Sequence, residues 1–184
     1  IGKHNILNAA AAVAVSINIG VKIAVIKESL KKFSGGQRRM TKIFTKNKNE
    51  FFDDYAHHPT EISSILDGIN KAYDNRKIIT VFEPHRYSRI MSLKKAFSKS
   101  FQQTDLVLIC PLYAAGEKKN VNFKWYNTEK KISNNSKKQV VLVKNQKELS
   151  NYFKKNLISN EIIVGMGAGS ISQWMRELKF SLWI

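Results

Sequence analysis

Apolar and polar residues follow one another along this chain in a pattern that predicts helices and strands in a regular order. Residues 5–19 and 21–33 carry apolar side chains at helical spacing, and Gly20 separates the two segments. After Ser34-Gly35-Gly36 the pattern changes to that of two short strands, at 41–45 and 50–53. We therefore predict two helices, a domain boundary after residue 33, and a hairpin at the start of the next domain.

The rest of the chain alternates between the two kinds of element. Helices are predicted at 60–73, 92–103, 146–156 and 169–179, with a weak one inside 117–138, and strands at 77–82, 105–110, 139–143 and 161–165. Strands that alternate with helices of about 10–15 residues indicate βαβ units. The predicted fold is α/β and Rossmann-like, a mainly parallel sheet with helices on both faces, preceded by the two helices.

Composition limits the class of protein. The 184 residues are 43% hydrophobic, as expected of a globular core with a fragment of a second domain. No run approaches the roughly 20 apolar residues of a membrane helix, so no membrane partner is expected. The lone Cys110 lies in an apolar run, which predicts a buried, reduced thiol and a cytoplasmic location. The opening on Ile1 instead of Met suggests a fragment or a processed product.

The charge raises an alternative function. A formal net charge of +17 is compatible with a basic α/β module that binds nucleotides or nucleic acid. However, Lys outnumbers Arg 25 to 6, which is typical of an ordinary solvated surface, and four of the six Arg form the pairs Arg38/Arg39 and Arg86/Arg89. A planar guanidinium clamps a carboxylate or phosphate better than Lys does. The pairs favour anion recognition at a site, with no nucleic-acid partner.

Two polar clusters carry the candidate chemistry, and each begins where a predicted strand ends. The first is Asp-Asp-Tyr-Ala-His-His-Pro-Thr-Glu at 53–61, and the second is Phe-Glu-Pro-His-Arg-Tyr-Ser-Arg at 82–89. In an open α/β sheet this is the carboxyl edge, where ligands bind. The first cluster could suggest a metal, but adjacent His57 and His58 do not easily present both rings to one ion, so no metal site is predicted. His58-Pro59 also has the pattern of a helix start.

Three further motifs each have a plainer alternative. His4 and Asn8 are i,i+4 neighbours on one helix face, but Asn5 could be an N-cap and the others surface groups. Arg38 and Arg39 could belong to a basic linker, and Arg86 and Arg89 could form surface ion pairs instead of converging on one carboxylate.

A glycine-rich segment, Gly-Met-Gly-Ala-Gly-Ser at 165–170, follows a predicted strand and opens a helix. The dinucleotide spacing fails because Ser170 stands at the last glycine position, and no acidic ribose ligand follows at the required distance. We predict a tight strand–helix junction with no cofactor.

In this order, the motifs resemble those of the ATP-dependent Mur ligases, among them the group that joins L-alanine to UDP-N-acetylmuramate. The resemblance implies that Arg39 contacts the ATP γ-phosphate and that Asp54 contacts the ribose. It places Tyr55 and His57 at the L-alanine pocket, with Arg39 and His57 the catalytic residues. The implied contacts of the adenine are His4, Asn5 and Asn8, and those of the L-alanine or product carboxylate are Arg86 and Arg89.

The resemblance also implies a reaction and a domain plan. The muramyl carboxylate takes the γ-phosphoryl of ATP, and the amine of L-alanine attacks the acyl phosphate. Residues 1–33 would be the tail of a central ATPase domain and 34–184 the C-terminal domain. The Mg²⁺ ligands and the other domains would lie upstream, so the chain alone is expected to be inactive. Two residues depart from the family pattern, Met40 in place of Phe and Ser170 in place of Asp. A relative that couples a whole peptide lacks the His-Arg-Tyr-Ser-Arg run, so L-alanine is the expected amino acid.

Overall fold

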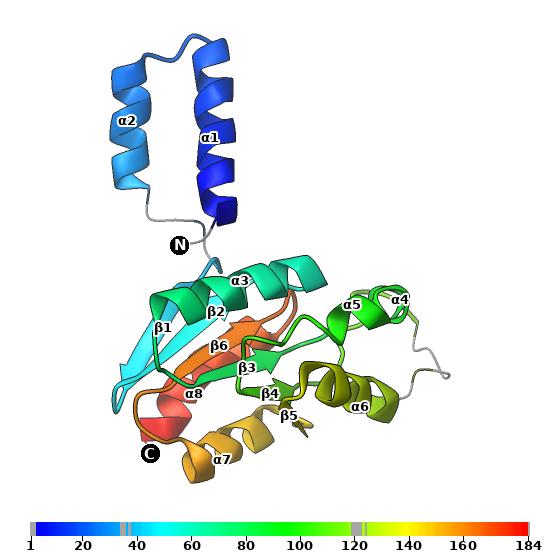
Figure 1. Ribbon diagram of the computed structural model, residues 1–184. Helices are drawn as coiled ribbons and strands as arrows, with labels where there is room; N and C mark the ends of the chain where they lie inside the picture. The colour runs from blue at the N-terminus through cyan, green and yellow to red at the C-terminus, as the bar shows by residue number, and fades with distance from the viewer. Residues whose placement is uncertain (1–2, 34–35, 37, 119–122, 124, 184) are drawn as a thin grey trace. The chain divides into compact units, whose positions relative to one another are not determined.

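The chain divides into two compact units, Ile1–Gln37 and Arg38–Ile184. The structure is a computed structural model, and it describes residues 3–33, 36, 38–118, 123 and 125–183 (Figure 1). The division falls a few residues beyond the boundary predicted after residue 33. Ser34, Gly35 and Gln37 of the predicted linker lie outside the described residues.

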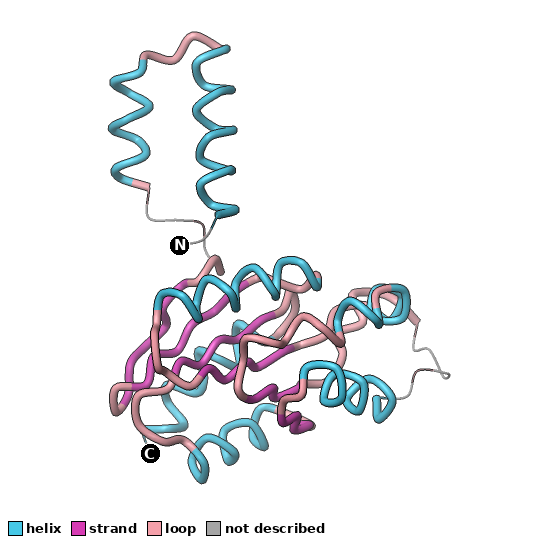
Figure 2. The backbone as a smooth tube through the Cα atoms, viewed as in Figure 1, coloured by secondary structure: helices cyan, strands magenta, loops and turns pink. Residues whose placement is uncertain are grey.

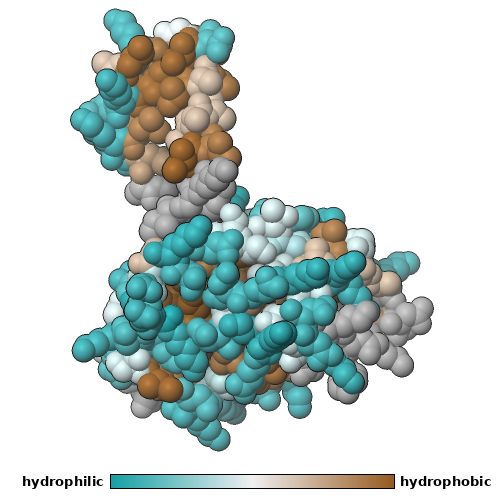
Figure 3. All heavy atoms as spheres, in the orientation of Figure 1, coloured by the Kyte–Doolittle hydropathy of each residue, from teal (hydrophilic) through white to brown (hydrophobic). Residues whose placement is uncertain are grey.

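The first unit is a pair of helices, α1 (Lys3–Asn18) and α2 (Ile23–Lys32). Gly20 adopts a φ of +84°, which a residue with a side chain rarely takes, and allows the turn between them. Of the side chains described in this unit, Ile26 alone is buried. Figure 3 shows the resulting apolar surface on the pair. Its large exposed side chains are Ile6, Leu7, Val15, Ile17, Ile19, Ile23, Val25, Leu30 and Phe33.

The second unit is built on a six-stranded sheet with the order β1-β2-β6-β3-β4-β5. The strands are β1 (Thr41–Lys46), β2 (Asn49–Asp54), β3 (Ile78–Phe82), β4 (Leu106–Ile109), β5 (Gln139–Leu142) and β6 (Ile162–Met166). Only β1 is antiparallel among these strands, and it forms one edge of the sheet. Along the chain the strands from β2 to β6 alternate with helices (Figure 2), which confirms the predicted, mainly parallel α/β sheet.

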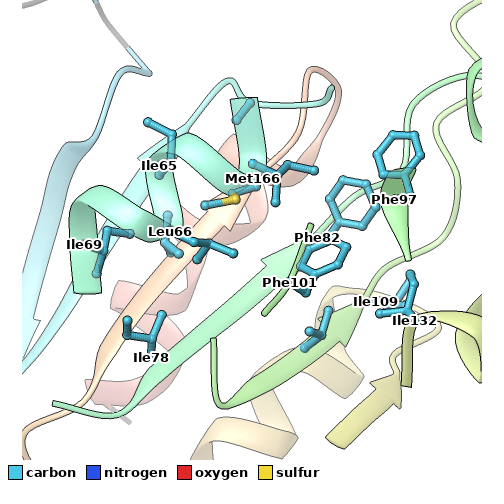
Figure 4. Close-up of a cluster of buried hydrophobic side chains, with 14 of the residues drawn as sticks. Ile65, Leu66, Ile69, Ile78, Phe82, Phe97, Phe101, Ile109, Ile132 and Met166 are labelled. Carbon is cyan, nitrogen blue, oxygen red and sulfur yellow. The ribbon is translucent and has the colours of Figure 1, made fainter. Parts of the chain in front are cut away.

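Helices cover both faces of the sheet, as predicted. They are α3 (Pro59–Ala72), α4 (Tyr87–Ser92), α5 (Lys94–Phe97), α6 (Trp125–Ser136), α7 (Gln146–Asn156) and α8 (Ile171–Trp183). One core contains side chains of α3, α4, α5 and α6 and is drawn in Figure 4; the other contains side chains of α7 and α8. In β3, Ile78 and Phe82 enter the first core, whereas Ile79 and Val81 enter the second. All five residues of β3 are buried because both faces are covered, which explains its unbroken apolar run.

Local capping sets the start of α3. His58 is the N-cap, Pro59 takes the first helical turn, and the Glu61 side chain completes a capping box with His58. The helix start predicted from His58-Pro59 is therefore confirmed, and the last residues of the first polar cluster form the first turn of α3.

The single helix predicted at 92–103 is wrong. The chain becomes helical earlier, in α4, and α5 ends at Phe97. The hydroxyl groups of Ser98 and Ser100 donate to the carbonyl oxygens of Lys95 and Ala96, 2.8 and 2.9 Å away. Such side-chain hydrogen bonds compete with helix continuation. No helix in the described part of the chain is long and apolar enough to cross a membrane.

Candidate active site

Four parallel strands end side by side at the carboxyl edge of the sheet. In the strand register, Met166 pairs with Asp54 on one side and with Phe82 on the other, and Phe82 pairs with Ile109. The segments that follow β2, β6, β3 and β4 therefore meet at one edge. This register brings the two polar clusters together, although twenty residues separate them in sequence.

Aromatic rings from three of these segments form a continuous row. The ring centroids of Tyr55 and His57 are 5.2 Å apart, those of His57 and His85 are 5.5 Å apart, and those of His85 and Tyr113 are 5.5 Å apart. At the first end, the guanidinium of Arg38 lies 4.8 Å from the centroid of Tyr55. We call Tyr55, His57, His85 and Tyr113 the ring row. It forms a partly exposed wall with side chains capable of proton transfer.

His57 is held in one tautomer by its own loop. Its Nδ1 lies 2.8 Å from the carbonyl oxygen of Tyr55, which can only accept a hydrogen bond. Nδ1 therefore carries the proton, and in the neutral ring Nε2 keeps a free lone pair. The Glu61 carboxylate accepts hydrogen bonds from the backbone N–H groups of His57 and His58, at 3.0 and 3.1 Å.

Glu61 also supplies negative charge beside this loop. Burial acts to raise the pKa of Glu61, but hydrogen bonds from the His57 and His58 backbone oppose it, and the net pKa is lowered. The carboxylate is thus ionised at neutral pH and stabilises the loop that carries His57.

His85 is held in the opposite tautomer. Nη1 of Arg89 lies 3.2 Å from Nδ1 of His85, and a guanidinium can only donate. Nδ1 is therefore the acceptor, and Nε2 carries the hydrogen. Burial lowers the pKa of His85, and the neighbouring charges of Arg89 and His57 lower it further. The ring row thus places an acceptor imidazole next to a donor imidazole.

Arg86 and Arg89 flank His85, but their settings differ. Arg86 is the N-cap residue of α4, and its φ of +69° is uncommon for a residue with a side chain. Its backbone N–H donates to the carbonyl oxygen of Tyr113 at 2.9 Å, and its side chain is exposed. Arg89 lies within α4 and is half-buried. One cation is therefore open to solvent, and the other is fixed on His85.

The Asp54 carboxylate binds the backbone of Met40, the residue that follows Arg39. Its oxygens accept hydrogen bonds from the N–H groups of Met40 and Ala56, at 2.8 and 2.7 Å. The residue is fully buried, and this burial raises the pKa of Asp54 against the effect of the two hydrogen bonds. The ribose contact predicted for Asp54 stays a prediction, because the carboxylate faces the backbone of its own unit.

Asp53 pairs with the side chain of Arg38, the residue that precedes Arg39. Oδ1 of Asp53 lies 3.7 Å from Nε of Arg38, and Oδ2 lies 3.4 Å from Nη2 of Arg176. Arg38 also donates to the carbonyl oxygen of Gly167. Asp53 is fully buried, whereas Arg39 is exposed. The adjacent arginines therefore differ: the Arg38 side chain is held by contacts within the unit, whereas the Arg39 side chain extends into solvent.

The glycine-rich segment after β6 is bound by a carboxylate of the chain itself. Glu83, only 2% exposed, accepts hydrogen bonds from the N–H groups of Gly169 and Ser170, both at 2.9 Å, and from the Ser170 hydroxyl. These groups lie at the N-terminus of α8, where backbone N–H groups favour a negative charge, and Glu83 supplies it. A Cβ on Gly167 would lie 2.9 Å from Cβ of Glu83, so the junction is as tight as predicted.

Three members of the site were missed by sequence reasoning. His85 stands inside a recognised motif without a predicted role, and Glu83 and Tyr113 were given none. The available signal was positional, since each follows the end of a parallel strand as the recognised clusters do. The predicted adenine contacts lie in the other unit. The side chains of His4 and Asn5 lie outside the described part of the structure, and Asn8 is exposed on α1.

Comparison with known proteins gives a consistent family. Residues 38–169 match the family model described as Mur ligase, glutamate ligase domain. The UDP-N-acetylmuramate–L-alanine ligase of Pelagibacter ubique is 49% identical over 178 residues, which is 97% of this chain and 38% of that protein. The enzyme of the same name from Desulfosudis oleivorans is 38% identical over 170 residues, 92% of this chain and 37% of that protein. The chain thus spans less than half the length of these relatives.

Solved structures agree. The UDP-N-acetylmuramate–alanine ligase of Thermotoga maritima superimposes with a TM-score of 0.78 at 27% identity, over 98% of this chain and 38% of that one. A murein peptide ligase of Psychrobacter arcticus gives a TM-score of 0.74 at 26% identity, over 98% of this chain and 37% of that one. With the family model matched across the sheet and its carboxyl edge, the chain belongs to the Mur ligase family, and its α/β unit is a Mur ligase C-terminal domain.

Proposed function

We propose that this chain is the part of an ATP-dependent ligase that binds L-alanine and contacts the ATP phosphates, in the ligation of L-alanine to UDP-N-acetylmuramate for peptidoglycan synthesis. The names of the similar curated proteins support this activity. The observation that carries it is the meeting of Arg86 and Arg89 with Tyr55 and His57 at one sheet edge, through the pairing of β2 and β3 with β6.

The arginines and the ring row have complementary tasks toward L-alanine. Arg86 and Arg89 bind its carboxylate, because guanidinium groups donate paired, charge-assisted hydrogen bonds. Tyr55 and His57 form a wall against its methyl group. Loss of fit gives only about 1–3 kcal/mol of discrimination per methylene, so steric exclusion of larger side chains adds to selectivity.

His57 is the proposed proton acceptor. L-Alanine enters as an ammonium ion, and its nitrogen attacks only after losing a proton. Nε2 of His57 is free to take it, because Nδ1 is occupied by the Tyr55 carbonyl oxygen. The nitrogen then bonds to the acyl carbon and the bond from that carbon to the phosphate oxygen breaks. The second surplus proton of the nitrogen passes to the departing phosphate, which leaves as hydrogen phosphate. The acyl phosphate itself forms when the muramyl carboxylate takes the γ-phosphoryl group and ADP leaves.

Arg39 is the proposed cation for this phosphoryl group. It is exposed, and the residues on both sides of it are tied to Asp53 and Asp54, so its base is fixed. A fixed positive charge stabilises the charge that develops during phosphoryl transfer. The proposed adenine contacts are His4, Asn5 and Asn8, and the ribose contact of Asp54 would require its carboxylate to be uncovered.

ATP in such a reaction would be accompanied by Mg²⁺. Among the described residues, no group of three His, Cys, Asp or Glu side chains could hold a metal ion. We place the Mg²⁺ ligands in other domains of the enzyme. In this chain, Arg39 acts as a cation and His57 as a proton carrier.

The exposed apolar side chains of the helix pair α1 and α2 are consistent with a further domain that packs against them. These side chains would be covered if residues 1–33 close a central ATP-binding domain, which is the partner proposed for them together with the N-terminal domain. The proposed location is the cytoplasm, and neither nucleic acid nor a membrane is a proposed partner. No specific observation favours the alternative of a nucleic-acid-binding module.

A chimera tests the function. This chain would replace the matching segment of the Pelagibacter ubique ligase, and phosphate release would be measured with and without L-alanine. We expect alanine-dependent release from the chimera and none from the 184-residue chain alone. Arg86→Ala should raise KM for L-alanine about 10- to 100-fold, the equivalent of one or two charge-assisted hydrogen bonds, and leave KM for ATP within about twofold.

The matched control is Lys154→Ala, which removes an exposed cation on α7, away from the carboxyl edge of the sheet. It should change neither KM. An equal rise of KM for L-alanine and for ATP in Arg86→Ala would disprove the assignment of Arg86 to L-alanine. Phosphate release that does not depend on L-alanine would disprove the proposed function.

A further inference from the structure

We propose that Tyr113 is a further wall of the amino-acid pocket and sets the upper size limit of the amino acid. The inference rests on the proposed function, because the pocket it completes is the one assigned to L-alanine. Tyr113 follows β4, a strand that contributes no other residue to the proposed site, and it closes the ring row at the end opposite Tyr55.

The backbone of Tyr113 is tied to both neighbours of His85. Its N–H donates to the carbonyl oxygen of Pro84 at 2.8 Å, and its carbonyl oxygen accepts from the N–H of Arg86 at 2.9 Å. Together these bonds form an isolated parallel bridge between His85 and Tyr113. The segment after β4 therefore cannot shift without moving the segment that carries His85 and Arg86.

The ring of Tyr113 is held from two sides. It stacks on His85 with an interplanar angle of 19° and a centroid distance of 5.5 Å. On another side it contacts Gly169, where an added Cβ would lie 2.5 Å from Cγ of Tyr113. Gly169 is itself fixed by its hydrogen bond to the buried Glu83. The same Cβ would lie 2.5 Å from Oε1 of Glu83, so a side chain larger than hydrogen at position 169 would crowd both the ring and the carboxylate.

Despite this support, Tyr113 is 44% exposed. An exposed aromatic ring that is already held in place contacts a ligand with little loss of side-chain freedom. Together with its stacking on His85, this indicates that the ring contacts a ligand as well as packing against the fold. A small amino acid bound by Arg86 and Arg89 would lie against His85, and the adjoining phenol ring would limit how far its side chain can extend.

The test uses the chimera and three variants. Tyr113→Ala should raise KM for L-alanine about tenfold, the equivalent of one lost aromatic contact, and leave KM for ATP within about twofold. It should also raise kcat/KM for L-valine relative to L-alanine about tenfold, since the size limit is relaxed. Tyr113→Phe, which keeps the ring, should retain both values. Gly169→Ala, which crowds the ring and Oε1 of Glu83, should raise the valine-to-alanine ratio in the same direction, and adding it to Tyr113→Ala should not raise that ratio further.

Tyr152→Ala is the matched control, because Tyr152 packs on Phe153 in α7, outside the candidate site. It should change neither KM nor the preference for L-alanine. An unchanged valine-to-alanine ratio in Tyr113→Ala, or an equal rise of KM for L-alanine and ATP, would overturn the inference while the parent chimera still shows the proposed function. A parent chimera without alanine-dependent activity would overturn both.

Discussion

Nη1 of Arg89 donates a hydrogen bond to Nδ1 of His85 across 3.2 Å, so the guanidinium and the imidazole act together. The arginine is always charged, and its presence disfavours a second positive charge on the ring. In the neighbouring loop, the Tyr55 carbonyl oxygen accepts a hydrogen bond from Nδ1 of His57, so this nitrogen carries the hydrogen in His57. One side-chain donor and one backbone acceptor thus give the two histidines opposite tautomers at one sheet edge.

The first prediction concerns pH. His85 should titrate below its ordinary pKa of 6.5, because burial, Arg89 and His57 all disfavour its charged form. A lowered folded pKa means that the unfolded chain binds the proton more readily, so this contribution to stability is present above about pH 6.5 and is lost as the pH falls through the folded pKa. Histidine ring signals followed by NMR across pH 4–8 would measure the pKa. Arg89→Met should raise it, and a His85 pKa above 6.5 in the parent chain would contradict the expected effect of burial and of Arg89.

The second prediction concerns Ser170. Ser170→Asp would place a second carboxylate against buried Glu83, replacing a hydroxyl donor by a like charge. We expect a loss of about 2–3 kcal/mol in the free energy of unfolding. Glu83→Gln in the same chain should restore most of it, because an amide donates to the new carboxylate. Urea unfolding of the two single variants and the double variant measures this coupling, and strictly additive effects would refute it.

The third prediction separates the adjacent arginines. Arg38→Ala removes a partner of the buried Asp53 and a donor to the Gly167 carbonyl oxygen, and should lower the free energy of unfolding by about 1–3 kcal/mol. Arg39→Ala removes an exposed side chain and should change stability by less than about 0.5 kcal/mol. In the chimera, Arg39→Ala should instead reduce kcat. Equal stability losses in the two variants would show that Arg39 is also structural.

The fourth prediction concerns Cys110. The thiol is buried, and burial raises its pKa far above the ordinary value, so almost no thiolate is present at neutral pH. A thiol reagent such as dithionitrobenzoate should react with the native chain only as fast as the chain opens, and rapidly in denaturant. Cys110→Ser serves as the blank. Rapid reaction of the native chain would contradict its burial.

Local sequence patterns determined much of this protein. The alternation of apolar and polar positions predicted the parallel sheet, its covering helices and the buried Cys110, because periodicity along the backbone shows which faces are buried. Capping chemistry at His58-Pro59 predicted the start of α3. The pattern did not show that Ser98 and Ser100 would end α5, since their hydroxyl groups could equally have faced water.

What the tertiary structure alone decided is which distant residues meet. β6 enters the sheet between β2 and β3, so Ser170 reaches Glu83, 87 positions earlier, and Gly169 reaches Tyr113. The aspartates of the first cluster are adjacent in sequence, yet Asp53 pairs with arginine side chains and Asp54 with backbone N–H groups. Strand order and register arise from packing over the whole domain, and neither helix propensity nor residue spacing encodes them locally. The sequence therefore determined which residues stand at strand ends, and only the assembled sheet decided which of them share a site.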